Sequence, residues 1–238
     1  MLDLGTPRLR AVLVLLTSIG FAISPVFTAP FTGFDPAFFS VELEFPPVQP
    51  AGYAFSIWGV IYLWLIASAA YGFIKRRDHT GWDATRPPLL VSTGIGASWI
   101  AVANTSPIGA TLLIYAMLIS ALIALFRAPT RDAAWLRLPL GLYAGWLSAA
   151  SFVSLATVLA GYGIFSREAA GWLGLLGALA FAATLANNLR VPSYGIAVIW
   201  ALAGVVLAHW QSDMLLAAAA FGGAGAILFY TLRPRAAA

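Results

Sequence analysis

Eight long apolar segments take up most of this 238-residue chain. A bilayer core about 30 Å thick is crossed by a helix of roughly 20 apolar residues. Only 9% of the residues are charged, which is too few to give a soluble core of this size a polar surface. The sequence therefore predicts an all-α fold, a polytopic membrane bundle of eight transmembrane helices. The apolar segments are residues 9–29, 53–74, 89–104, 107–126, 138–160, 169–189, 192–210 and 213–232.

The basic residues indicate the direction of these helices. If the N-terminus is cytoplasmic, every Lys and Arg except Arg167 falls in a cytoplasmic segment, as the positive-inside rule describes. Omitting the short third segment would reverse all later helices and destroy this asymmetry. We therefore expect an integral protein of the bacterial cytoplasmic (inner) membrane with both termini cytoplasmic. The residues concerned are Arg8, Arg10, Lys75, Arg76, Arg77, Arg86, Arg127, Arg131, Arg137, Arg190, Arg233 and Arg235.

The sequence gives little support for catalysis or metal binding. It has no cysteine and two histidines, which excludes thiolate chemistry and argues against a multi-histidine metal site. Ser98 is followed by Trp99 where an intramembrane serine protease would have glycine. We therefore predict no catalytic residue, no metal ligand and no required cofactor, and we attribute the basic excess to loops rather than to nucleic-acid binding. His209 and Asp213 lie on either side of a short turn. The two side chains could share a proton or bind an axial ligand, or they could simply be solvated.

Aromatic residues recur at helical spacing in the first five segments. Phe55, Trp58 and Tyr62 fall on one helical face, and Tyr143 and Trp146 begin a similar stripe in the fifth segment. Such rings either pack the bundle and face lipid, or form the wall of a ligand pocket.

Small residues dominate the last three segments. Gly171, Gly174 and Gly177 recur every third residue, and Ala218, Gly222 and Ala226 every fourth. Small side chains at these spacings allow helix backbones to approach closely in lipid, so we expect tight packing here. These helices could also form a docking surface for a partner or a second copy, giving a homo-oligomer.

Residues 50–62, Pro-Ala-Gly-Tyr-Ala-Phe-Ser-Ile-Trp-Gly-Val-Ile-Tyr, resemble the second-helix signature of the tryptophan-rich sensory protein/translocator (TspO/MBR) family. Pro50, Trp58 and Tyr62 fit that signature, whereas Tyr53 stands where the family has tryptophan.

The fifth and third segments carry further resemblance. Residues 143–150 are similar to the family's Tyr-x-x-Trp-x-x-Phe-Ala pattern, and Trp99 matches a third-helix tryptophan. Gly96 and Ser154 stand where the family has asparagine. Because the likeness covers residues 9–160, we expect a TspO-like five-helix bundle over residues 1–165. Residues 166–238 would then add three Gly/Ala-rich transmembrane helices, making the chain a divergent, C-terminally extended relative.

The resemblance implies a pocket under the first loop that binds porphyrins, haem or sterol-like ligands, and a role in tetrapyrrole sensing or transport. A pocket walled by aromatic rings suits a flat conjugated ligand on physical grounds as well. The segment Phe31–Gln49 is amphipathic and rich in proline, and would either close over the pocket or rest on the lipid headgroups. The expected ligand-binding residues are Pro50, Phe55, Trp58, Tyr62, Trp99, Tyr143 and Trp146.

The leading hypothesis is thus a membrane protein that senses or transports a hydrophobic planar molecule such as a porphyrin, with the bilayer and this ligand as its partners. The alternative is a small-solute or lipid transporter with no tetrapyrrole role.

Overall fold

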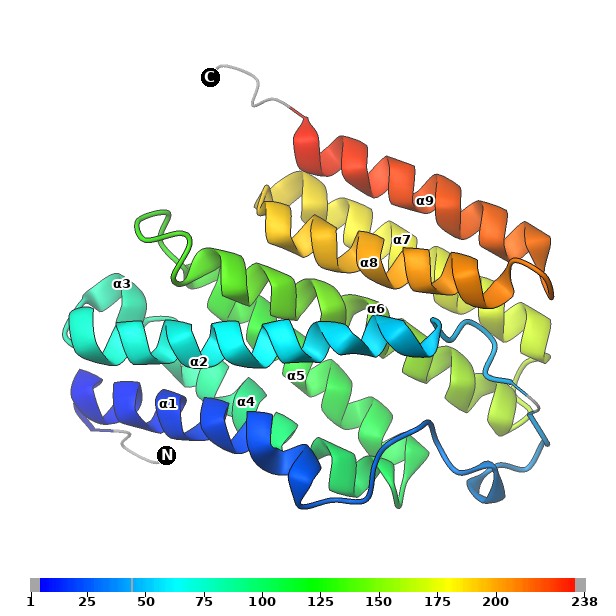
Figure 1. Ribbon diagram of the computed structural model, residues 1–238, viewed down its shortest axis with the longest axis horizontal. Coiled ribbons are helices and arrows are strands. Elements are labelled where there is room, and N and C mark those ends of the chain that lie inside the picture. Colours follow the sequence, from blue (N-terminus) through cyan, green and yellow to red (C-terminus); the bar gives the residue numbers. More distant parts are fainter. Residues whose placement is uncertain (1–4, 44, 234–238) are drawn as a thin grey trace.

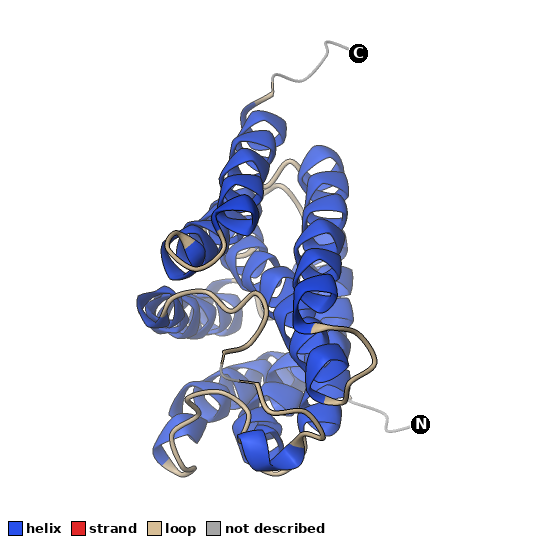
Figure 2. Cartoon of the chain, turned by 90° about the vertical axis from the view of Figure 1, so that its right-hand side faces the viewer, coloured by secondary structure: helices blue, strands red, loops and turns tan. Residues whose placement is uncertain are grey.

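The computed structural model describes residues 5–43 and 45–233, and this part of the chain is helical with no strand (Figures 1 and 2). Two short elements, η3 (Gly52–Ser56) and α3 (Thr80–Asp83), precede α2 and α4. The long helices are α1 (Pro7–Ile23), α2 (Ile57–Lys75), α4 (Arg86–Ala103), α5 (Pro107–Arg127), α6 (Arg137–Gly161), α7 (Arg167–Leu189), α8 (Pro192–His209) and α9 (Met214–Leu232).

All eight predicted helical segments are present in the described residues, and seven of them are long and apolar enough to cross a membrane. The exception is α4, because Arg86 and two prolines open the helix and lower its hydropathy. A tight turn joins α4 to α5, where Ser106 accepts a hydrogen bond from the Gly109 amide at the start of α5. An all-helical membrane bundle is therefore established, while the eighth crossing stays a prediction.

The central helix is α6, which packs against α2, α5, α7 and α8. The helices α1, α2, α4 and α5 lie on one side of it and α7–α9 stack on the other (Figure 1). Most α6 residues are buried, including Tyr143 and Trp146. Because α6 joins the two groups of helices, any cavity along it is shared between them.

Glycines set the closest approach between α6 and α8. A methyl group on Gly145 would collide with the backbone carbonyl of Tyr194, and one on Gly141 would come within 2.5 Å of Ser193 Oγ. Tyr194 Oη in turn donates a hydrogen bond of 3.0 Å to Ser148 Oγ on α6. The two backbones therefore meet at a distance that a larger residue does not permit.

The predicted glycine packing is confirmed on α7 and absent at Gly222. A methyl group on Gly174 would come within 2.8 Å of Ala156 Cβ, and one on Gly177 within 2.8 Å of the Phe152 ring. By contrast, no atom lies within 4 Å of a methyl group built on Gly222. The glycines of α7 thus allow that helix to pack closely on α6, whereas the small residues of α9 face outward near Gly222.

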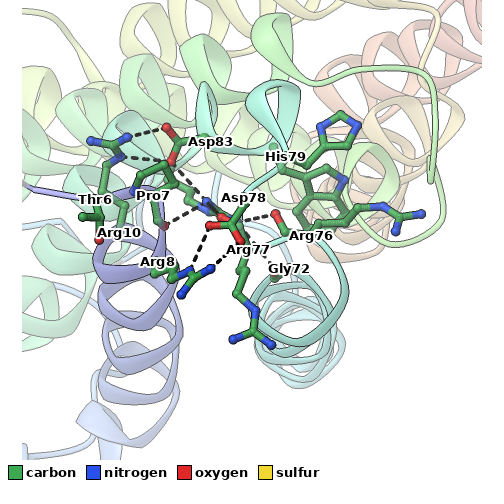
Figure 3. Close-up of polar contacts among 12 residues, drawn as sticks. Thr6, Pro7, Arg8, Arg10, Gly72, Arg76, Arg77, Asp78, His79 and Asp83 are labelled. Carbon is green, nitrogen blue, oxygen red and sulfur yellow. Dashed lines mark hydrogen bonds and ion pairs between the residues drawn. The ribbon is translucent and has the colours of Figure 1, made fainter.

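The basic residues gather at one end of the bundle, which we call the basic end. Figure 3 shows Arg8 pointing toward Asp78 and Arg10 toward Asp83. A third ion pair joins Arg76 Nε to Asp132 Oδ2 at 2.7 Å. These pairs tie α1, the segment after α2 and the α5–α6 connection together. Arg235, also expected at this end, lies outside the described residues.

Among the described basic residues of this end, Arg86 is the buried one, with 3% of its surface exposed. Its position depends on α3, a helix that the sequence did not predict, because α3 places Asp83 3.1 Å from Arg86 Nη1. The hydrogen bond from Arg10 and that from Arg86 hold the pKa of Asp83 below its usual range, so the carboxylate is charged at neutral pH. The remaining acceptors of the guanidinium are the carbonyl oxygens of Pro7, Gly72, Arg76 and Arg77.

The opposite end, which we call the loop end, carries the first loop, residues 30–52. Backbone and side-chain hydrogen bonds fix this loop to α6, α7 and α8, so it lies across the bundle rather than extending from it. The contacts are Val41 N to Gly161 O (2.9 Å), Arg167 Nε to Phe45 O (3.0 Å) and Ala51 N to Gly204 O (3.0 Å).

Candidate ligand cavity

An apolar cavity of about 390 Å³ lies beneath the first loop, against α6. Two stretches of the first loop form part of its wall, residues 31–34 and the group Pro46, Val48, Gln49 and Pro50. The remaining wall comes from η3 and five helices: Gly52, Phe55, Trp99, Ile114, Trp146, Ala149, Ala150, Phe152, Val153, Ser154, Thr157, Gly174, Leu175, Ala178, Ala201, Leu202 and Val205.

Aromatic rings supply much of this wall, and none of the described lining residues carries a charge. Phe31 meets Trp99 edge to face at 5.1 Å between ring centres, and Phe55 meets Trp146 in the same way at 5.8 Å. Trp99 Nε1 also donates a 2.9 Å hydrogen bond to the carbonyl of Ala110, which fixes its ring between α4 and α5. An uncharged aromatic wall favours ligands that bind by stacking and apolar burial.

Four of the seven predicted binding residues line the cavity: Pro50, Phe55, Trp99 and Trp146. Trp146 is 2% exposed, and its Nε1–H has no hydrogen-bond acceptor in the described part of the chain. A buried donor without an acceptor costs about 1–3 kcal/mol. An acceptor atom on a ligand would recover part of that cost if it reached this group.

The other three, Trp58, Tyr62 and Tyr143, form an aromatic cluster around Phe21 beside the cavity rather than in its wall. Trp58 stacks on Tyr62 at 5.2 Å and meets Trp146 edge to face at 6.2 Å. The two predicted aromatic stripes therefore do face each other. Through Trp146, this cluster supports the cavity wall from behind.

The structure shows what occupies the two positions at which the TspO/MBR pattern has asparagine. The Phe21 ring packs on Gly96 so closely that a methyl group there would come within 2.7 Å of it. Ser154 lines the cavity and shares a hydrogen bond of 2.6 Å with Thr111 on α5. An aromatic ring thus covers Gly96, and a hydroxyl pair occupies the position of Ser154.

Sequence reasoning missed the contribution of α7 and α8. Gly174, Leu175 and Ala178 on α7 line the cavity, as do Ala201 and Leu202 on α8. The glycine stripe on α7 is the available signal, but on sequence it predicts close helix packing or a docking surface rather than a cavity wall. The cavity consequently lies between the predicted five-helix unit and the last three helices, not within the first unit.

The region around Pro50 docks on α8 as well. Trp200 Nε1 donates a 2.8 Å hydrogen bond to the Ala54 carbonyl, and its ring meets Tyr53 edge to face at 5.4 Å. Gly204 provides the space, since a methyl group there would come within 2.8 Å of Pro50 Cβ. The segment that carries the family resemblance is therefore positioned by a helix outside the resembling region.

The turn between α8 and α9 separates the roles of His209 and Asp213. Asp213 Oδ1 accepts a 3.0 Å hydrogen bond from the Leu216 amide and caps α9. His209 is 5% exposed and is hydrogen-bonded to the backbone of Gln49 in the first loop. The described residues show no hydrogen bond between the two side chains. Asp213 therefore caps α9, whereas His209 contacts the first loop.

Comparison with known proteins agrees with this architecture. The family model described as TSPO-like protein matches residues 12–233. Searches of curated proteins and of solved structures each found no match. The family match does not stop at residue 160 but continues through α7 and α8 and along α9, the helices that complete the cavity and its support. The chain therefore belongs to the TSPO-like family of membrane proteins.

Proposed function

We propose that this protein binds a hydrophobic planar molecule such as a porphyrin in the cavity beneath the first loop, and senses or transports it. The observation that carries the proposal is the combination of a 390 Å³ volume, aromatic walls and an uncharged lining. Small-molecule sites in proteins are concave and mostly apolar, with a few polar groups that fix orientation. Here Gln49, Ser154 and Thr157 are such groups.

Filling the cavity tests this proposal. Ala178 lines the cavity, so Ala178→Phe places a ring in the space that the ligand needs. We expect the affinity for protoporphyrin IX, measured by quenching of tryptophan fluorescence in detergent, to fall at least about tenfold.

The matched control is Ala226→Phe on α9, where the original side chain is exposed on the surface of the bundle. It makes the same chemical change and should leave the affinity unchanged. Equal porphyrin affinity in Ala178→Phe and the parent protein would contradict the proposed cavity.

We further propose that the basic end faces the cytoplasm, in a bacterial inner membrane. The positive-inside rule supports this direction, because every basic residue in the described part of the chain except Arg167 lies at that end. In intact cells, a membrane-impermeant thiol reagent should then label Ser40→Cys in the first loop and not Arg77→Cys. Labelling of Arg77→Cys alone would reverse the assignment.

A further inference from the structure

A second cavity lies beside the aromatic one at the loop end and has a different chemical character. Its volume is about 390 Å³, and its wall includes Arg167, His209 and Gln211. Pro46, Gln49 and Pro50 line both cavities, so a short segment of the first loop separates an uncharged space from a polar one. One ligand that crossed this boundary would meet apolar surface at one end and polar groups at the other.

Arg167 brings a positive charge to this polar cavity. Its Nε donates to the Phe45 carbonyl, while its terminal nitrogens make no hydrogen bond or ion pair with the described residues. Arg167 is also the exception to the basic end, since the other described Lys and Arg side chains belong to the opposite end. A guanidinium with both terminal NH2 groups available is suited to bidentate binding of a carboxylate.

The neighbouring groups leave that charge uncompensated within the second cavity. His209 lies in the same wall and is hydrogen-bonded to the backbone of Gln49. The carboxylates of Glu168 and Asp213 line a third cavity of about 180 Å³, which Arg167 and His209 also border. No described carboxylate lines the second cavity, and Arg167 is the basic side chain in its described wall.

We propose that the polar cavity is a carboxylate-binding subsite, in which Arg167 holds the charged end of an amphipathic ligand whose apolar body occupies the aromatic cavity. This inference rests on the proposed function and adds a ligand class to it: a hydrophobic molecule that carries at least one carboxylate. Gln49 lies in both walls and marks the point at which the ligand changes from apolar to charged.

A matched pair of probes tests the subsite. Protoporphyrin IX carries two carboxylates, and its dimethyl ester has the same ring without the charges. In a neutral detergent at pH 7 we expect the parent protein to bind the acid about tenfold more tightly than the ester, because a charge-assisted hydrogen bond is gained. Arg167→Gln should lower affinity for the acid alone and bring the ratio near one, while Arg167→Lys should keep part of the preference.

The control is Arg131→Gln, which removes the same charge from an exposed position at the basic end and should preserve the ratio. Equal affinity of the parent protein for acid and ester would overturn the subsite and leave the proposed function intact. Equal weakening of both probes in Arg167→Gln would also overturn it, since Arg167 would then act only through Phe45 and the first loop. Displacement of the acid by anionic phosphatidylglycerol, with no effect on the ester, would reassign Arg167 to a lipid phosphate. Failure of both probes to bind the parent protein would overturn the proposed function itself.

Discussion

Gly145→Ala is expected to destabilise the bundle by about 1–3 kcal/mol, as overpacking of a close contact does. The added methyl group meets the backbone carbonyl of Tyr194, and a backbone group cannot move aside as a flexible side chain can. To accommodate it, α8 must move away from α6 and weaken the 3.0 Å hydrogen bond between Tyr194 and Ser148. The free energy of unfolding in mixed micelles, measured by titration with a denaturing detergent, reports this loss.

Gly222→Ala is the matched control, because no atom lies within 4 Å of the new methyl group. Both substitutions gain the same helix propensity, roughly 1 kcal/mol relative to glycine, so the difference between them isolates the α6–α8 contact. A Gly145→Ala protein as stable as Gly222→Ala would show that the two helices do not meet at this distance.

Arg86→Gln is expected to have an effect of about 3 kcal/mol or more, the cost of breaking a buried charged pair. Arg86 is the hydrogen-bond centre of the basic end, and a shorter neutral side chain cannot reach its acceptors. The carbonyl oxygens of Gly72 and Arg76 at the end of α2 would lose their donor, as would the Pro7 carbonyl at the start of α1. The same detergent titration measures the change.

Arg77→Gln provides the comparison for charge alone. Arg77 is exposed, and Figure 3 shows its side chain directed away from the cluster around Asp83. Because its backbone carbonyl still accepts from Arg86, this variant should change stability by no more than about 0.5 kcal/mol. If both variants lost the same stability, net charge rather than the hydrogen-bond network would hold the basic end together.

Hydropathy was sufficient to predict the long helices, and the placement of charge predicts their alternating directions across the membrane. Each apolar segment corresponds to a helix, because in lipid an uninterrupted run must satisfy its own backbone hydrogen bonds. What this reasoning could not find was α3, whose four residues, Thr80–Asp83, lie in a polar segment and are held by contacts distant in sequence. Trp82 illustrates this: it is buried against Gly72 rather than solvated.

The candidate site was predictable in part for a similar reason. Helical spacing predicted that Trp58 shares a helix face with Phe55 and Tyr62, and that Trp146 shares one with Tyr143. The structure adds that Trp58 and Trp146 meet. The spacing of residues within one helix does not specify which neighbouring helix packs against that face. The parts of the cavity wall that come from α7 and α8 could therefore not be inferred. Ala178 is one example: a small residue on a helix is typical of helix packing, whereas here it borders the cavity.

Thiol labelling of Thr157→Cys, with and without protoporphyrin IX, is the measurement that tests the central claim most directly. The chain has no cysteine, so one introduced thiol gives an unambiguous signal. Thr157 lines the cavity, whereas Ser40 is exposed in the first loop and is not part of its wall. A ligand that fills the cavity should slow labelling of Thr157→Cys by about tenfold or more, because a pocket buries most of its ligand's surface, and should leave Ser40→Cys unaffected. An unchanged labelling rate for Thr157→Cys at saturating porphyrin would contradict binding in this cavity.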